Sequence, residues 1–324
     1  MDKKLIVDKG ERLDKFLSKH LEESRNQIEA LIKKGFVKVD DKNIIKTGYK
    51  LKENQEIDIT FPQVEQSKPL EIDFDVEKIY EDDHILIINK PSNLIVHDAP
   101  SVKEATLVDW LKHNNISLST ISGEERHGIV HRLDKGTSGL MVVAKSNEAH
   151  VKLSEQLQDK SMGRYYLALI DLPLKDNMTI EKPIGRNPKN RLQQAVVANG
   201  KDAKSKFFRV ANSKKDKYEL IACKLFTGRT HQIRVHLNSI NRHIIGDSLY
   251  GFKGSLDNIN RFYLHAYLLY LIHPITNEKL YFRAKLPDDM QKFLNDNFEN
   301  IGDIDDKIRQ DSLIDSFSIR DNWM

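Results

Sequence analysis

The sequence predicts a two-domain α+β protein, and three observations lead to this expectation. The chain has 324 residues, enough for about two domains of roughly 100–200 residues each. Strand-like stretches outnumber helical ones and do not alternate regularly with them, which favours a mixed, mainly antiparallel sheet with flanking helices. The segment from Pro62 to Pro69 has two prolines and no apolar periodicity, so we interpret it as part of a linker.

The composition is that of a compact protein. It is 39% hydrophobic and 31% charged, which is enough apolar material for a core and too much for a disordered chain. No apolar run approaches the ~18–20 residues of a membrane span, and the first residues lack the apolar segment of a secretory signal. The single cysteine, Cys223, can form neither an intramolecular disulfide nor a cysteine-based zinc site. We therefore expect a cytoplasmic protein with no membrane partner and no metal.

Residues 1–62 are expected to form a small α+β domain. Apolar residues recur every three or four positions within 13–21 and again within 28–32, which predicts two helices with one buried face each. Ser24 and Gln27 have the spacing of a capping box ahead of the second helix. Short strands are expected at residues 36–39 and 56–61.

A linker at residues 63–74 is expected to precede a larger domain at residues 75–297. The strands expected in this domain are residues 84–89, 139–144, 165–170, 218–226 and 267–272, and the helices are residues 105–113, 148–157 and 230–240. Residues 288–324 contain ten acids and four bases, and the part from 298 to 324 is expected to be an acidic extension. Since it lacks helix stop signals, this extension is either loosely docked or disordered.

Basic residues gather in two segments of the chain. Residues 33–52 carry a net charge of +5 and residues 186–217 a net charge of +8, although the whole chain carries only +3. Such clustering suggests a polyanionic partner, and Lys33, Lys34 and Lys38 are candidate phosphate contacts. Charge alone does not distinguish RNA, DNA and an acidic protein, and the alternative is that these lysines lie in solvated loops. The second segment is either a contact to a nucleic-acid backbone or a solvated hairpin.

The densest group of chemically capable residues is HRLDKGTSG at residues 131–139. Asp134 lies between bases and precedes glycine, threonine and serine, which fits a loop that presents a carboxylate at the edge of a sheet. Coulomb attraction to the adjacent cations would keep this carboxylate ionised, as a nucleophile requires. The alternative is an ordinary turn at the start of a strand, in which the aspartate caps backbone amides.

A second candidate segment is TGRTHQIRVH at residues 227–236. Thr230 is placed to cap the helix that follows, and an apolar stripe begins at Ile233. Arg234 adjoins this stripe and would point partly inward, where a guanidinium needs a carboxylate partner. The alternative is a surface helix whose arginine and histidine are solvated.

Two histidines four residues apart, His127 and His131, suggest a metal site at first sight. The residues between them are strand-like, and in a strand the two side chains would lie ~13 Å apart at ~3.3 Å per residue. They could not then chelate one ion, so we reject this interpretation.

Two adjacent tyrosines, Tyr165 and Tyr166, open a predicted strand. In a strand their rings face opposite sides, so one is expected in the core. The other could stack on a base or move a proton, and the alternation alone does not say which tyrosine this is.

Six segments of the chain occur in an order known from one family. They are INKPSNLIVH (88–97), HRLDKGTSGL (131–140), YLAL (166–169), TGRTHQIRVHL (227–237), GDSLYG (246–251) and LHAYLLYLIHP (264–274). Together they resemble the RluA/RluD-type pseudouridine synthases over about residues 71–287, and the layout is most similar to the D-type enzymes that modify large-subunit ribosomal RNA. The first domain resembles the α-L RNA-binding domain that often precedes this catalytic domain.

The resemblance implies a pseudouridine synthase fold and an isomerisation that needs no cofactor, in which the N1–C1′ bond of a uridine breaks and C5 rejoins C1′. It implies that Asp134 is the catalytic aspartate, which attacks C1′ or assists formation of a glycal-like intermediate. Arg234 would hold Asp134 by an ion pair, and Tyr166 would stack on the target base and handle a proton. The other residues expected to bind the substrate are Arg132, which would hold the base out of its stack or fill the space it leaves, Arg229 and His231.

RNA is then the expected partner. We expect the protein to be a monomer, because nothing in the sequence requires an oligomer. A uridine inside paired RNA must be flipped out at a cost of a few kcal/mol, which basic contacts and stacking at ~1–3 kcal/mol per base offset. One alternative is a non-catalytic RNA-binding or ribosome-assembly protein with the same fold. A hydrolytic glycosidase is disfavoured because such enzymes usually pair two carboxylates, and the motif supplies one.

Overall fold

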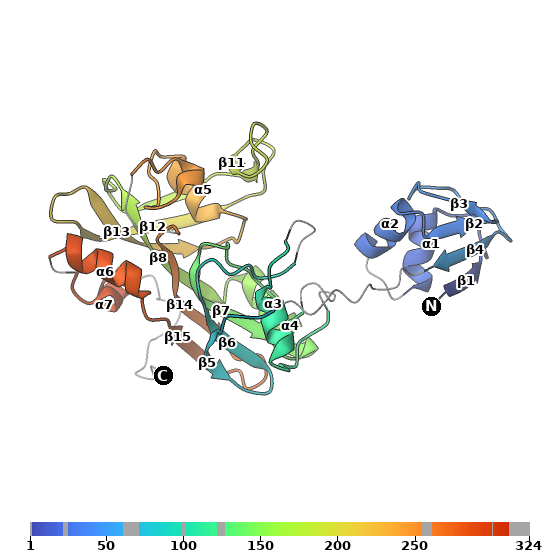
Figure 1. The fold of residues 1–324 in the computed structure, drawn as a ribbon, viewed down its shortest axis with the longest axis horizontal. Coiled ribbons are helices and arrows are strands. Elements are labelled where there is room, and N and C mark those ends of the chain that lie inside the picture. Colours follow the sequence, from blue (N-terminus) through green and yellow to red (C-terminus); the bar gives the residue numbers. More distant parts are fainter. Residues whose placement is uncertain are drawn as a thin grey trace. The chain divides into compact units, whose positions relative to one another are not determined.

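The structure is a computed structural model that describes residues 2–21, 25–60, 71–98, 102–121, 127–254, 261–299 and 301–310. The chain forms two compact units, residues 1–70 and residues 71–324 (Figure 1), which we call the N-terminal unit and the second unit. Most of the linker expected at residues 63–74 lies outside the described residues. Within the described ranges no helix has the length and apolar character needed to cross a bilayer.

The N-terminal unit combines two helices with a four-stranded antiparallel sheet in the order β1-β4-β2-β3. Its elements are β1 (Asp2–Ile6), α1 (Leu13–His20), α2 (Arg25–Lys33), β2 (Val37–Val39), β3 (Lys42–Asn43) and β4 (Glu56–Thr60). Phe16 and Leu17 of α1 are fully buried against Ile32 of α2 and Ile57 of β4, so the apolar stripes of both helices face the sheet. The two predicted helices are confirmed, whereas the capping box expected at Ser24 lies outside the described residues.

The second unit is built on a nine-stranded sheet in the order β5-β6-β7-β14-β8-β13-β12-β9, with β15 also paired to β14. Its pairs are antiparallel except β7 with β14, which is parallel. The strands are β5 (Glu77–Glu81), β6 (Ile85–Lys90), β7 (Ser138–Ala144), β8 (Gly163–Asp171), β9 (Met178–Glu181), β12 (Lys204–Asn212), β13 (Tyr218–Leu225), β14 (Leu264–Ile272) and β15 (Lys279–Arg283). The expected mixed, mainly antiparallel sheet is confirmed. The sequence pattern missed β5, β9, β12 and β15 because they are partly exposed and charged or polar residues interrupt their apolar positions.

Helices cover both faces of this sheet. They are α3 (Leu107–His113), α4 (Asn147–Asp159), α5 (Gln232–Asn238), the 3₁₀ helix η2 (Ser248–Tyr250), α6 (Asp288–Asn297) and α7 (Ile304–Gln310). Neighbouring side chains of a strand point to opposite faces, and on β8 Tyr166 packs with α3 and α5 whereas Tyr165 packs with α6. The strands β8 and β7 are therefore buried on both faces, which explains why their sequences are continuously apolar.

A separate hairpin, β10 (Ile184–Arg186) and β11 (Gln194–Val196), overlaps the start of the basic segment 186–217. Its connecting residues Lys189, Arg191 and Leu192 are exposed. A solvated hairpin, one of the two alternatives for this segment, is thus present. Its exposed cations are also accessible to a nucleic-acid backbone.

Two local expectations are corrected or refined by the structure. The helix expected at residues 230–240 begins at Gln232, because His231 has a left-handed φ of 58° and makes no side-chain cap, so Thr230 is not the capping residue. In the acidic extension, α7 packs on the second unit with Ile308 buried, and Tyr267 donates a 2.7 Å hydrogen bond to Asp305. This part of the extension is docked, whereas residues 311–324 lie outside the described residues.

A buried polar chain joins β7, β14 and α6. His265 of β14 is fully buried, and its Nδ1 lies 2.9 Å from Oγ of Ser138, the residue opposite it in the parallel pair. Arg261 donates a 2.8 Å hydrogen bond to the same hydroxyl and pairs with Asp289 of α6. Burial and, to a smaller extent, the charge of Arg261 lower the pKa of His265 to about 4.

The second unit should therefore become less stable as the pH is lowered, because protonation of this histidine favours the unfolded chain. An unfolded histidine takes up its proton near pH 6.5 and the folded one only near pH 4, so the unfolded chain binds more protons in this window. The free energy of unfolding should drop by up to about 3 kcal/mol as the pH falls from 6.5 to 4, at 1.36 kcal/mol per unit. Urea denaturation at pH 7.5 and pH 5 tests this against His265→Gln, in which this part of the pH dependence should be absent. An identical pH dependence in both proteins would contradict the assignment.

Candidate active site

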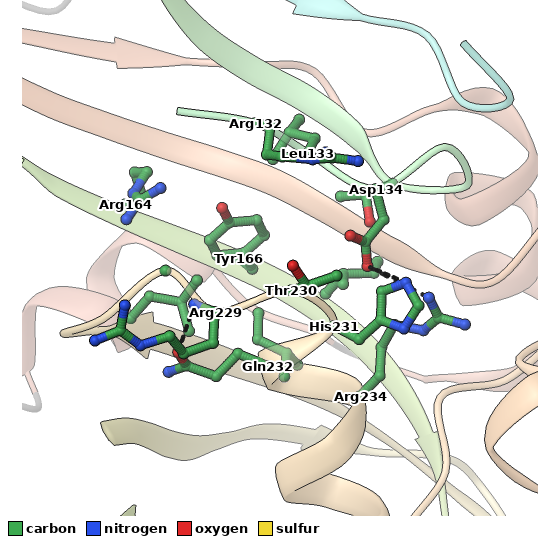
Figure 2. Close-up of a pocket in the computed structure, with 15 residues that line it drawn as sticks. Arg132, Leu133, Asp134, Arg164, Tyr166, Arg229, Thr230, His231, Gln232 and Arg234 are labelled. Atoms are coloured by element: carbon green, nitrogen blue, oxygen red, sulfur yellow. Dashed lines mark hydrogen bonds and ion pairs between the residues drawn. The ribbon is translucent and has the colours of Figure 1, made fainter. Parts of the chain in front are cut away.

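A pocket on the α3 and α5 side of the sheet collects residues from four stretches of the chain (Figure 2). They are the loop that precedes β7, the start of β8, the residues from the end of β13 into α5, and the start of β14. Asp134, Tyr166 and Arg234, predicted from separate motifs, all line this pocket. The structure thus brings together the three residues that the resemblance assigned to catalysis.

Asp134 lies in the loop ahead of β7, and this loop turns back on itself through a 3.0 Å hydrogen bond from Thr137 N to the Asp134 carbonyl. Its side chain is 17% exposed and faces the pocket. Arg234 Nη1 donates to Asp134 Oδ2 at 3.3 Å, and among the described residues no backbone amide donates to this carboxylate. The alternative in which Asp134 caps the turn is therefore wrong, and the carboxylate is available to a ligand.

Arg234 is held by a second carboxylate that the sequence analysis did not identify. Its Nε and Nη2 donate to the two oxygens of Asp247 at 2.7 and 2.8 Å, and both side chains are almost completely buried. The guanidinium also lies over two aromatic rings, 4.3 Å from the centroid of Phe262 and 4.7 Å from that of Tyr250. These contacts leave Nη1 directed at Asp134. Burial by itself lowers the pKa of Arg234, but the hydrogen bonds and charge of Asp247 outweigh it and the pKa is raised.

Tyr166 is the tyrosine that serves the pocket, and Tyr165 is the one that fills the core. Tyr165 is fully buried in the cluster on the α6 side, and Tyr166 lines the pocket on the other face of β8. The expectation that one ring belongs to the core is confirmed. Burial raises the pKa of Tyr166, with a smaller contribution from the charge of Asp134, so this side chain is a neutral phenol near pH 7.

The other substrate-binding candidates of the second unit also line the pocket. The exposed Arg132 approaches His97, with 3.1 Å between Nη1 and Nε2, and the exposed Arg229 donates to the carbonyl of Asp202 at 2.9 Å. His231 Nδ1 is 2.8 Å from the Tyr250 hydroxyl, and its Nε2 is 4.0 Å from Asp134 Oδ2. Burial, opposed by Asp134, lowers the pKa of His231, so the ring is neutral near pH 7.

The three lysine candidates belong to the N-terminal unit and not to this pocket. Lys33 ends α2, Lys34 follows it, and Lys38 lies in β2. All three are exposed, and Lys33 pairs with Glu29 of the same helix at 3.1 Å. Each of them presents a cation to solvent on the N-terminal unit.

Arg164 lines the pocket but was missed in the sequence. It precedes Tyr166 by two residues on β8, so the alternation of a strand places both side chains on one face. The sequence contained this signal, because any strand that presents Tyr166 to a ligand presents Arg164 beside it. Asp247 carried no comparable local signal, since its partner lies 13 residues away on another element.

The described part of the chain contains no cluster of three or more His, Cys, Asp or Glu side chains that could hold a metal ion. The strand expected between His127 and His131 does not begin at His127. Residues 127 and 128 form a turn and not a strand, and Gly128 has a φ of 70°. Glycine is required there because a Cβ would lie 2.7 Å from the Ala144 carbonyl oxygen. His131 is buried and accepts a 3.2 Å hydrogen bond from Val142 N.

Comparison with known families defines the class of protein to which this fold and pocket belong. A family model described as RNA pseudouridylate synthase matches residues 84–239, which include Asp134, Tyr166 and Arg234. A second model, described as S4 domain, matches residues 11–57 of the N-terminal unit. The molecule is thus a synthase domain of this class preceded by an S4 domain.

Individual relatives extend this match over almost the whole chain. An uncharacterized RNA pseudouridine synthase of Helicobacter pylori strain J99 is 47% identical over 94% of this chain and 95% of its own length. The ribosomal large subunit pseudouridine synthase D of Zymomonas mobilis is 36% identical over 87% of this chain and 92% of its own length. The solved structure of human RNA pseudouridylate synthase domain containing 1 shares the fold, with a TM-score of 0.59 and 22% identity over 76% of this chain and 97% of that one. The chain belongs to the RNA pseudouridine synthase family, and it is an isomerase that acts on RNA.

Proposed function

We propose that this enzyme converts uridines of large-subunit ribosomal RNA into pseudouridines, with Asp134 as the catalytic aspartate. The observation that carries the proposal is the pocket itself, in which one carboxylate faces Tyr166 and is held by a buried guanidinium. In the reaction the N1–C1′ bond breaks, the base turns and C5 bonds to C1′, while C5 loses a proton and N1 gains one. Atoms and electrons balance without an oxidant or a second substrate.

Asp134 acts at the sugar, where it either attacks C1′ or assists formation of a glycal-like intermediate. A partly exposed carboxylate in a pocket can meet an incoming ribose, and the hydrogen bond from Arg234 fixes the position of this carboxylate. Arg234 is the positioning group, because Asp247 and the two rings fix its orientation before any substrate arrives. Such preorganisation means that little reorganisation is needed when charge develops in the reaction.

Tyr166 supplies the aromatic face on which the flipped uracil stacks. Its ring lies next to Asp134 and Arg164 in the pocket (Figure 2), and stacking replaces part of what the base loses on leaving the helix, at about 1–3 kcal/mol per base. As a neutral phenol it can also donate or relay a proton. Arg132 and Arg229, exposed at the pocket, are placed to contact the surrounding RNA, and His231 lies near Asp134 to contact the bound nucleotide.

A hydrolytic glycosidase fits the pocket less well. Most such enzymes place two carboxylates on opposite sides of the bond that breaks. Among the described residues that line this pocket, Asp134 is the one acidic side chain, and Asp247 is buried behind Arg234. Transfer of C1′ within the same nucleoside needs no second carboxylate to activate water.

Ribosomal RNA as the substrate is supported by the relatives and by the S4 domain. Several relatives of 36–38% identity are named ribosomal large subunit pseudouridine synthase D. The exposed lysines of the N-terminal unit and the basic segment 186–217 would meet a phosphate backbone. We place the enzyme in the cytoplasm, where it works as a monomer on ribosomal RNA or a precursor particle.

Release of tritium from RNA labelled at C5 of uridine tests the proposal. The purified protein should release tritium from large-subunit ribosomal RNA that lacks its modifications, and chemical mapping should find pseudouridine at the same sites. Asp134→Asn serves as the matched control. Tight binding of this RNA without tritium release would instead establish the non-catalytic RNA-binding alternative.

The exposed lysines of the N-terminal unit should add affinity and not chemistry. Replacing Lys33, Lys34 and Lys38 together by glutamine should weaken binding to ribosomal RNA about tenfold or more at physiological salt. The salt dependence should fall by up to about 2 units of slope if all three contact phosphates, at about 0.7 per contact to a single strand. The kcat at saturating RNA should stay unchanged.

Control substitutions at Lys160, Lys175 and Lys292, which are exposed on the second unit, should change the slope less. If both triple variants bound RNA alike across a salt titration, these lysines of the S4 domain would have no special role in docking.

A further inference from the structure

Arg164 is a buried cation that has no anionic partner among the described residues. Its residue exposure is 9%, and its Nε has no hydrogen-bond partner. Within the described ranges no carboxylate forms an ion pair with it, in contrast to Arg234 and Arg261, the other buried arginines of the second unit. Its side chain nevertheless lines the pocket, beside Tyr166 (Figure 2).

The neighbours of Arg164 do not offset its charge. A guanidinium stays protonated even when buried. His131, whose pKa is influenced by Arg164, is itself neutral because burial, assisted by this arginine, lowers its pKa well below the usual value. Tyr166 is also neutral, and Asp134 is already engaged by Arg234. Since a buried charge without a partner opposes folding, Arg164 is better explained by a ligand that supplies the missing negative charge.

The chain leaves one side of this guanidinium uncovered. Gly228 lines the same pocket, and a Cβ at this position would lie 3.4 Å from Nη2 and 3.7 Å from Nη1 of Arg164. A larger side chain would therefore cover the guanidinium from that direction. Gly228 is itself exposed, so a ligand can reach the two terminal nitrogens from solvent.

We propose that Arg164 binds a phosphodiester group of the RNA that adjoins the uridine in the pocket. This inference rests on the proposed function and adds a phosphate site to it. A phosphate offers two oxygens that match the fork of a guanidinium, and it brings the negative charge that a uracil carbonyl lacks. Arg132 and Arg229 line the same pocket and make its surroundings positive. The positive potential attracts the negatively charged backbone of the flipped nucleotide.

A chemical double-mutant cycle tests this site. Binding is measured in the Asp134→Asn background, so that no turnover intervenes, with a short RNA that carries one target uridine. The phosphates on its 5′ and 3′ sides are replaced in turn by an uncharged methylphosphonate, and the protein carries Arg164, Arg164→Gln or Arg164→Lys. A methylphosphonate at one of the two positions should weaken binding about tenfold, and so should Arg164→Gln. The two changes together should weaken binding no more than either change alone. Arg164→Gln should also lower the slope of log K against log salt by about 0.7, and lysine should restore that slope.

Three outcomes would overturn the proposal. The first two are additive losses in the cycle and no effect of either methylphosphonate on the protein that retains Arg164. The third is an unchanged salt slope in Arg164→Gln together with a fall in kcat when the same substitution is made in the enzyme that retains Asp134. The last result would place the guanidinium on the uracil. The methylphosphonate arm needs no change at Arg164, so it decides the question even if a variant folds poorly. Coupling in the cycle with no tritium release by the enzyme would retain the phosphate site and reject the proposed reaction, whereas release without coupling would reject the site alone.

Discussion

Asp134→Asn is expected to reduce tritium release by at least about 10⁴-fold while the fold and RNA affinity persist. The amide has the shape of the carboxylate but neither its charge nor its nucleophilicity, and comparable losses follow when an essential catalytic carboxylate is made neutral. The side chain is partly exposed, and within the described part of the chain Arg234 is its one hydrogen-bond donor. We therefore expect the free energy of unfolding to change by no more than about 1 kcal/mol.

Three measurements check this prediction. Single-turnover tritium release gives the chemical step, a titration of RNA gives the affinity, and thermal unfolding gives the stability. Release within tenfold of the unmodified protein would show that Asp134 does not carry the reaction. If Asp134→Asn lost both its activity and its folded state, a second variant, Asp134→Glu, would test the chemical role. Glutamate keeps the charge but moves it by one methylene.

Removal of Arg234 is expected to have the second largest effect. Arg234→Ala leaves Asp247 buried without its cation and Asp134 without its positioning group. Breaking a buried pair in this way costs about 3–5 kcal/mol of stability, and the loss of preorganised electrostatic stabilisation costs about 10²–10³-fold or more in turnover. RNA affinity at low temperature, where the variant stays folded, should be nearly unchanged, because the guanidinium is only 6% exposed and is already engaged by Asp247 and Asp134.

Arg234→Lys separates the two effects of this substitution. Lysine keeps the charge but has no planar fork to bind both oxygens of Asp247 while a third nitrogen reaches Asp134. We expect most of the stability to return and turnover to stay at least about 100-fold low. Asp247→Asn, a change that leaves Arg234 in place, should reduce turnover less. Near-normal turnover in the lysine or the alanine variant would show that the ion pair with Asp134 is not needed.

The sequence was informative wherever a local pattern determines structure. Period-two alternation predicted that Tyr165 and Tyr166 face opposite sides of a strand, and β8 confirms it. Three- and four-residue spacing predicted α1 and α2 in the N-terminal unit. The order of six short motifs indicated the family, and the comparisons with known proteins confirm it.

The same patterns failed where neighbours in space outweighed neighbours in sequence. Thr230 looked like a helix cap, but His231 adopts a left-handed conformation and contacts Tyr250, so the helix starts later. The partly exposed strands β5, β9, β12 and β15 were missed because charged and polar residues interrupt their apolar positions. Helix α7 was left open, since its docking depends on contacts of Asp305 with Tyr267 and Arg283 of the sheet.

What the sequence alone determined is which side chains are available for chemistry and on which kind of element each lies, because backbone periodicity and motif order are local properties. What only the tertiary structure decided is which of these side chains contact one another. Asp134 and Arg234 are 100 residues apart and meet at 3.3 Å, Asp247 holds the guanidinium from behind, and Arg164 is left without an anion. Charge pairing in a buried site depends on distances of a few ångströms between distant segments, and those distances exist only once the sheet has assembled.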